Sequence, residues 1–84
     1  MNLQRLLIKA YNSRVGLSFA ELQRLVEAFG FRLSRVFGSY LINVRPESGE
    51  IVNLRSVRGD AKPYQVRQFL QLVERLGLQL EADE

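Results

Sequence analysis

The spacing of apolar residues changes at Gly30, and this change restricts the fold more than any other feature of the chain. Before Gly30, apolar residues recur at helical spacing, namely Leu22, Leu25, Val26 and Phe29. That spacing is typical of the buried face of an amphipathic helix. From Phe31 onward apolar and polar residues alternate, as they do in a half-buried β-strand. The chain therefore has to pack a helix against a sheet.

The helix before Gly30 has clear signals at both ends. Ser18 and Glu21 stand three residues apart and form a capping box, in which each side chain satisfies a free backbone amide at the helix start. Leu17 and Leu22 are placed to form the accompanying hydrophobic staple. Gly30 can end the helix in a left-handed conformation. We expect a helix over residues 19–29.

Three strands and a further helix are expected after Gly30. The first strand runs from Phe31 to Gly38, which reads as a turn or bulge, and the second covers residues 39–45. Residues 46–49 have the composition of a turn and lead to a third strand over residues 50–54. After a polar loop, Pro63 suits the first turn of a helix that ends at Gly77. A short amphipathic helix is also expected over residues 2–11, followed by a connector.

This order predicts an α+β protein: a two-layer sandwich with a three-stranded antiparallel sheet, both main helices on one face and the other face open. Strand parity places Tyr40 on the same side as Ile42 and Val44. We expect that side to be the packed one unless Gly38 carries a bulge. In the first strand, parity places Phe31, Leu33 and Arg35 together, opposite Arg32, Ser34 and Val36.

Composition limits the environment and the class of partner. The 84 residues include no cysteine and no histidine, and no apolar run is long enough for a signal peptide or a membrane span. We therefore expect a cytoplasmic protein without membrane association. The net charge is only +3, but the cations gather between Arg32 and Arg67. Because arginine suits phosphate oxygens, this region favours a polyanionic partner, although arginine is also common on ordinary surfaces.

Three segments of the chain resemble the HicA family of toxin-antitoxin mRNA interferases. They are Arg35-Val36-Phe37-Gly38-Ser39-Tyr40-Leu41-Ile42-Asn43-Val44, Val52-Asn53-Leu54 and Ala61-Lys62-Pro63-Tyr64-Gln65-Val66-Arg67-Gln68-Phe69-Leu70. The resemblance covers roughly residues 18–80. It implies a fold of the double-stranded-RNA-binding type, with single-stranded RNA or mRNA and a HicB-like antitoxin protein as partners.

The resemblance also implies a site around the glycine-serine pair. In that family the pair is followed by the histidine on which RNA cleavage depends, and here that position is Tyr40. Tyrosine has an ordinary pKa near 10 and is a poor general base at neutral pH. It can still donate a proton or stack on a base, or it can simply fill the sheet surface. The candidate RNA-binding residues are Arg35, Ser39, Arg55, Arg58 and Lys62.

Three functions follow from these residues. The preferred one is a HicA-like toxin component that binds RNA and is impaired in cleavage because the histidine is absent. An active endoribonuclease with a histidine-free site is the second, and a non-catalytic module that binds a HicB-like antitoxin is the third. No metal or cofactor is expected, because no histidine, cysteine or clustered carboxylate is spaced to hold an ion.

Residues outside the HicA-like segment form an N-terminal helical extension (1–17) and an acidic tail (81–84). The extension is expected to pack onto the domain, and the alternative is that it serves a homodimer or partner contacts.

Overall fold

The computed structural model describes residues 2–12 and 17–81, and it contains three helices and three strands. In chain order these are α1 (Leu3–Asn12), α2 (Phe19–Ala28), β1 (Arg32–Phe37), β2 (Tyr40–Val44), β3 (Ile51–Arg55) and α3 (Pro63–Leu76). Each expected element is present, with bounds that differ by no more than two residues. The connector was expected over residues 12–16, and Asn12 is instead the last residue of α1. Residues 13–16 and the last part of the acidic tail, 82–84, lie outside the described residues.

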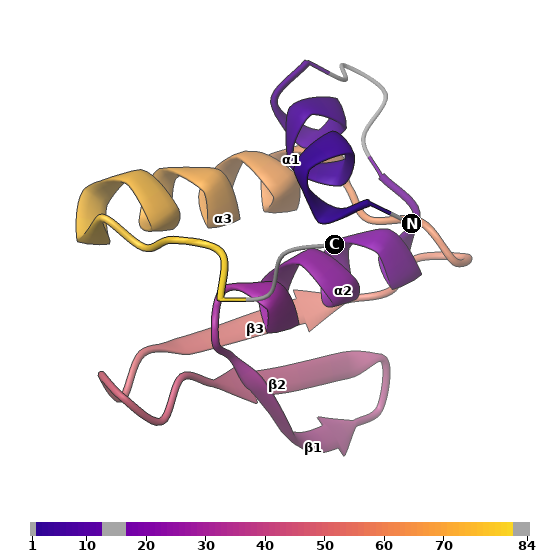
Figure 1. The fold of residues 1–84 in the computed structure, drawn as a ribbon. Helices are drawn as coiled ribbons and strands as arrows, with labels where there is room; N and C mark the ends of the chain where they lie inside the picture. The colour runs from indigo at the N-terminus through magenta and orange to yellow at the C-terminus, as the bar shows by residue number, and fades with distance from the viewer. Residues whose placement is uncertain (1, 13–16, 82–84) are drawn as a thin grey trace.

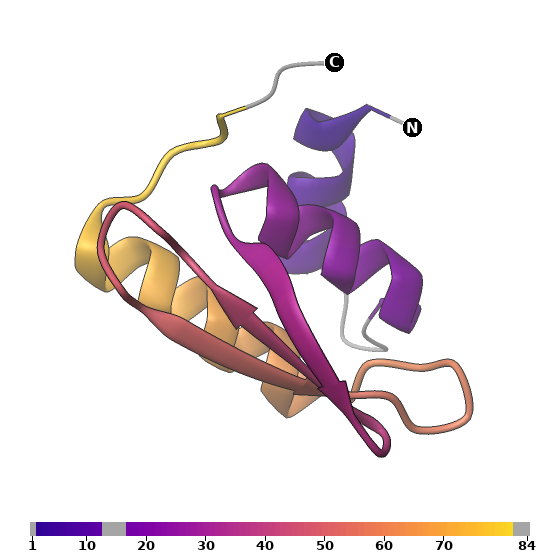
Figure 2. The same ribbon diagram turned by 90° about the horizontal axis from the view of Figure 1, so that it is seen from below.

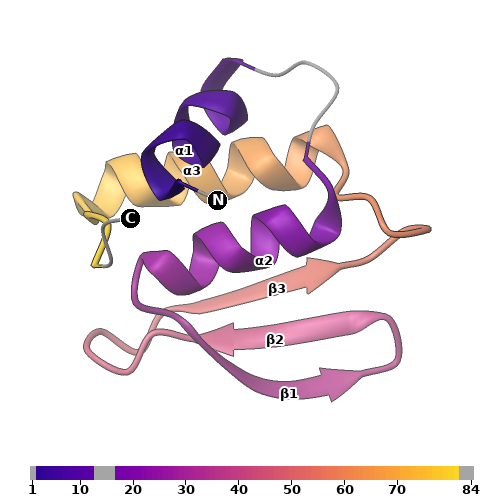
Figure 3. The same ribbon diagram turned by 45° about the vertical axis from the view of Figure 1, so that its right-hand side comes forward.

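The strands form one antiparallel sheet in the order β1-β2-β3. The helices all lie on one side of this sheet, with α1 packed across α2 and α3 on the side away from the strands (Figure 1; Figure 3). Seen from below, the strands lie in front of α3 and beside α2, and no helix is drawn over them (Figure 2). The predicted α+β class and open antiparallel sheet are therefore confirmed. None of the helices in the described ranges has the length and apolar character needed to cross a membrane.

Helix α2 begins as its sequence predicts. The Glu21 N–H donates to the Ser18 hydroxyl at 3.1 Å, and the Ser18 N–H donates to the Glu21 carboxylate at 3.0 Å. The same carboxylate pairs with the Lys9 ammonium of α1 at 3.0 Å. Gly30 follows the helix with φ of +97°, a left-handed conformation that favours glycine.

The core lies between the helices and β3. Phe69 of α3 meets Phe29 and Phe31 edge to face, at ring-centroid distances of 5.6 and 6.0 Å, an arrangement favoured by the ring quadrupoles. Leu54 of β3 contributes to the same cluster. The chain then returns to this core after α3, because the Glu81 N–H donates to the Ala28 carbonyl at the end of α2 at 2.7 Å.

The described part of the N-terminal extension packs onto the domain. Leu3, Leu6 and Ala10 of α1 are buried in the common core. The Tyr11 hydroxyl donates to the Glu74 carboxylate of α3 at 2.9 Å. Burial and this neighbouring carboxylate raise the pKa of Tyr11 above its usual range.

Strand β1 differs from the expected half-buried strand, since all six of its residues are exposed. It lies at the edge of the sheet farthest from the helices (Figure 3). Its register with β2 shifts between Leu33 and Arg35, so Ser34 is the extra residue of a β-bulge. The bulge places Arg35 on the same side as Arg32, and Leu33 on the same side as Val36. The expected parity of β1 is therefore wrong beyond Leu33.

The face expected to be packed is the open one. In β2 the side chains of Leu41 and Asn43 lie on the side of the helices, and Asn43 is fully buried, while Tyr40, Ile42 and Val44 point to the opposite, uncovered face. Asn43 and Gln23 of α2 exchange two amide hydrogen bonds, at 2.7 and 3.2 Å. The hydrogen-bonded Asn43 therefore lies on the side of the sheet where Ile42 and Val44 were expected.

We predict that the capping box stabilises the fold in a pH-dependent way. The hydrogen bond from the Ser18 N–H, and then that from Lys9, lowers the pKa of Glu21 below its ordinary value of 4.5. A carboxylate with a lowered pKa in the folded state contributes stability above its ordinary pKa, and this contribution is lost as the pH falls through the lowered value. Glutamine can still take part in a capping box, but it lacks the charge that pairs with Lys9. At pH 7, Glu21→Gln should therefore lower the unfolding free energy by about 1 kcal/mol.

Urea unfolding of both proteins between pH 7 and pH 2 measures this difference. The gap between the parent protein and Glu21→Gln should narrow in acid. Glu50→Gln, in the turn between β2 and β3, is the control and should change stability by less than about 0.5 kcal/mol at pH 7. A difference in unfolding free energy that stays constant down to pH 2 would contradict the stabilising role of the ionised Glu21 carboxylate.

Candidate nucleic-acid interface

The open face of the sheet is cationic and partly aromatic. The register of the strands places nine side chains on it, three of them arginines and none of them acidic. These residues are Arg32, Arg35, Phe37, Tyr40, Ile42, Val44, Ile51, Asn53 and Arg55. A surface that combines arginine with exposed aromatic rings suits phosphates and unstacked bases.

Tyr40 and Arg55 form a pair at one end of this face. They are directly opposite each other in β2 and β3, and the Arg55 guanidinium lies 5.6 Å from the centre of the Tyr40 ring, within range of a cation–π interaction. Tyr40 is 44% exposed. Within the described part of the chain, no protein group hydrogen-bonds to its hydroxyl. The ring and the guanidinium are thus both available to a ligand.

The turn between β1 and β2 lies beside this pair. Gly38 has φ of +62° and forms the turn with Ser39, so Gly38 is a turn residue and the bulge lies at Ser34 instead. The Ser39 carbonyl accepts a hydrogen bond from the Ser56 N–H at 3.1 Å, which ties the turn to the end of β3. Phe37, before the turn, is 73% exposed. Ser39 therefore serves the backbone of the site, next to an exposed aromatic ring.

Arg58 and Lys62 lie at the same end of the sheet but line a separate cavity. The loop that carries them follows β3, near the turn between β1 and β2 (Figure 1). It is fixed to the start of α2, because the Phe19 N–H donates to the Gly59 carbonyl and the Ala61 N–H to the Leu17 carbonyl. The cavity has a volume of about 590 Å³. The structure therefore brings Arg35, Ser39, Tyr40 and Arg55 together and leaves Arg58 and Lys62 beside them.

Arg45 belongs to the basic middle of the sequence but has a structural role. Its Nε donates to the Phe29 carbonyl at the end of α2 at 3.1 Å, and its guanidinium lies 3.6 Å from the Glu47 carboxylate and 3.7 Å from that of Glu81. Only 13% of its side chain is exposed. Arg45 joins the β2–β3 hairpin to α2 and to the C-terminal segment.

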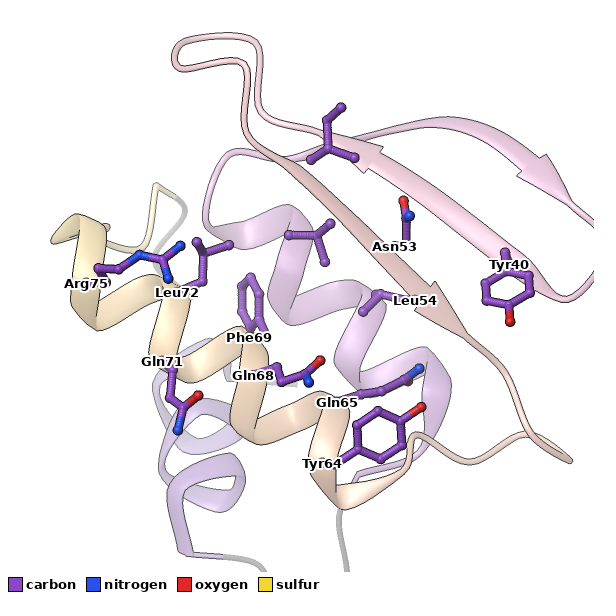
Figure 4. A pocket seen from close by; sticks show the side chains of 12 residues that line it. Tyr40, Asn53, Leu54, Tyr64, Gln65, Gln68, Phe69, Gln71, Leu72 and Arg75 are labelled. Carbon is purple, nitrogen blue, oxygen red and sulfur yellow. The ribbon is translucent and has the colours of Figure 1, made fainter.

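A groove beside β3 was not anticipated from the sequence. It lies between β3 and α3, has a volume of about 450 Å³, and is lined by Tyr40 and Tyr64 at one end and Arg75 at the other (Figure 4). Tyr64, at the start of α3, is 47% exposed. The one signal in the sequence was the glutamines on one side of α3, Gln65, Gln68 and Gln71.

The side chains on this face can contact phosphates and bases. Guanidinium groups can neutralise phosphate charge, and the Tyr40 ring can stack on a base. RNA cleavage needs in addition a base for the 2′-hydroxyl and an acid for the leaving oxygen. Among the described residues, no group of three or more histidine, cysteine, aspartate or glutamate side chains is gathered to hold a metal ion.

Comparisons with known proteins identify no relative: no family model matches the chain, and neither a curated protein nor a solved structure is significantly similar to it.

The orientation of the sheet can be tested by truncating one residue on each face. Leu54→Ala should lower the unfolding free energy by about 3 kcal/mol, because the Leu54 side chain lies in the core. Tyr40→Ala should cost at most about 1 kcal/mol, since it removes an exposed ring and one cation–π contact. Ile51→Ala is the control on the open face, and urea unfolding measures all three. A cost of 3 kcal/mol or more for Tyr40→Ala would place that ring on the packed face.

Proposed function

We propose that this protein is a HicA-like toxin component that binds single-stranded RNA on the open face of its sheet and is impaired in mRNA cleavage. The observation that supports the proposal best is the half-exposed Tyr40 ring beside the Arg55 guanidinium, on a face without carboxylates. This pair offers a stacking surface and a phosphate contact at adjacent positions. Arg35 adds a second cation to the same face.

The element order is consistent with the proposal. A helix, three antiparallel strands and a second helix, with one open sheet face, is the arrangement that the HicA resemblance implies through a fold of the double-stranded-RNA-binding type. The additional helix α1 packs on the side of α2 and α3 away from the sheet (Figure 3). It therefore leaves the proposed RNA surface uncovered.

The impaired cleavage follows from the residues at the site. Tyr40 occupies the position at which the HicA family has its histidine, and the chain has no histidine elsewhere. The neighbouring cations can stabilise charge on a phosphate, but guanidinium stays protonated and cannot accept a proton. The site therefore lacks a ready general base.

RNA binding should depend strongly on salt and on the open face. We predict that Arg55→Gln weakens binding of a labelled 20-nucleotide single-stranded RNA and reduces the slope of log affinity against log salt by about 0.7. Arg5→Gln is the matched control, because it removes the same charge from α1. Gel-shift titrations at several salt concentrations give the slopes, and the same RNA on a denaturing gel reports cleavage.

The outcomes separate the three functions. Salt-dependent binding with intact RNA supports the proposal. Cleavage by the parent protein that disappears in Tyr40→Phe would indicate an active endoribonuclease with a histidine-free site. If Arg55→Gln and Arg5→Gln behave alike, the open face is not the RNA surface. If the parent protein binds no RNA, the remaining function is a module that binds a HicB-like antitoxin.

A single substitution tests whether cleavage has been lost at one position. We predict that Tyr40→His produces RNA cleavage where the parent protein gives none, because imidazole can both accept and donate a proton near pH 7. Tyr64→His is the matched control, since Tyr64 is a tyrosine of similar exposure, 47% against 44% for Tyr40. Cleavage is measured with the same labelled RNA. An inactive Tyr40→His would mean that more of the site than this position has diverged.

A further inference from the structure

The outer edge of β3 carries backbone groups that no described residue of the chain bonds. In an antiparallel pair, the backbone N–H and C=O groups of every second residue bond to the neighbouring strand. The N–H and C=O groups of the residues between them point away from that strand. The Arg45 N–H donates to the Glu50 carbonyl, and the Ser56 N–H donates to the Ser39 carbonyl. These two bonds fix the alternation, so the N–H and C=O groups of Ile51, Asn53 and Arg55 point to the free edge.

One of these three positions is already bonded by a side-chain amide. In the amide orientation that satisfies both of its polar atoms, Gln65 of α3 donates to the Arg55 carbonyl at 3.2 Å and accepts from the Arg55 N–H at 3.1 Å. Gln65 thus makes the two hydrogen bonds to the Arg55 backbone that a neighbouring strand would make. Within the described part of the chain, the edge-facing groups of Ile51 and Asn53 have no such partner.

The space beside Ile51 and Asn53 is the groove between β3 and α3. Its volume of about 450 Å³ falls in the range of ligand pockets and suits a short extended segment. Phe69 and Leu72 of α3 provide apolar surface, and Gln68 and Gln71 provide further amides in the groove lining (Figure 4). A strand placed here would have amide partners on the α3 side as well as on β3.

The other edge of the sheet is much less suited to pairing. Strand β1 carries a bulge at Ser34 and the exposed arginines Arg32 and Arg35, and both features discourage the addition of a strand. The register of β3 with β2 is regular throughout. Strand addition is therefore favoured at β3.

We propose that this groove binds an extended, acidic segment of another protein, about five residues long, which pairs with the edge of β3 as an added strand. Main-chain hydrogen bonds to Ile51 and Asn53 supply affinity, and pockets for alternate side chains supply selectivity. Among the described residues, the lining contains Arg75 and no carboxylate, so a carboxylate of the segment belongs at the Arg75 end. A second copy of this chain fits less well, because the Gln65 side chain obstructs a two-fold pairing of whole β3 strands at both ends.

Selection of random heptapeptides displayed on phage, with the whole protein immobilised, tests this proposal. The matched counter-target is Asn53→Pro, which removes one outward N–H and leaves the bonds between β2 and β3 intact; proline is tolerated at such edge positions. We expect enriched peptides that contain carboxylates and bind Asn53→Pro at least tenfold more weakly. Arg75→Glu should weaken the same peptides by a similar factor.

Two measurements on the parent protein complete the test and do not depend on the folding of any variant. Only every second N–H of an added strand faces β3. Peptides N-methylated at those positions should therefore lose binding, whereas peptides N-methylated at the positions between them should keep it. Amide hydrogen exchange at Ile51 and Asn53 should slow when an unmodified peptide is added. The proposal is overturned if no peptide is enriched, if both targets bind equally, or if the exchange changes map elsewhere. Self-association that disappears in Asn53→Pro would identify a second copy as the occupant and would also overturn it.

Discussion

The amide pair between Asn43 and Gln23 determines which face of the sheet meets the helices. Asn43 is fully buried, and its two hydrogen bonds to Gln23 satisfy a polar group that would be costly to bury alone. Because side chains in a strand alternate, this pair also places the residues on either side of Asn43 on the uncovered face. A shift of β2 by one residue would turn Tyr40 inward and remove the Asn43 amide from the half-buried Gln23. The orientation of the candidate RNA surface therefore depends on this polar contact together with Leu54, the core side chain that β3 directs to the same side.

The elements that could be predicted are those whose signals are local. The capping box of α2 and the glycines at its end and at the end of α3 lie within a few residues of the boundaries they set, and the structure has them as expected. The face of β2 could not be predicted, because the residue that makes Asn43 acceptable inside lies 20 positions away in the chain. For the same reason the apolar side chains of Ile42 and Val44 suggested the wrong side.

The candidate site likewise contains some residues that local sequence indicated and others that only the tertiary structure places there. Tyr40, Ser39 and Arg35 were singled out from one contiguous segment, and Arg55 comes to them through the pairing of β2 with β3. Charge alone could not distinguish the roles of the arginines. Arg45 is enclosed and bonds the end of α2, whereas Arg35 and Arg55 are exposed on the sheet. The groove beside β3 requires α3 to lie along the strand edge, which is a tertiary arrangement that no segment of the sequence encodes by itself.

Tyr40 belongs to two surfaces, and this links them physically. Its ring contributes to the open face beside Arg55 and also lines one end of the groove between β3 and α3. RNA stacked on the ring and a segment that covers it from the groove would compete for the same atoms. Any such competition has to be reciprocal, because the coupling free energy between two ligands is the same whichever binds first. An occupant of the β3 edge could therefore weaken RNA binding without contacting Arg35, and RNA would weaken that occupant equally.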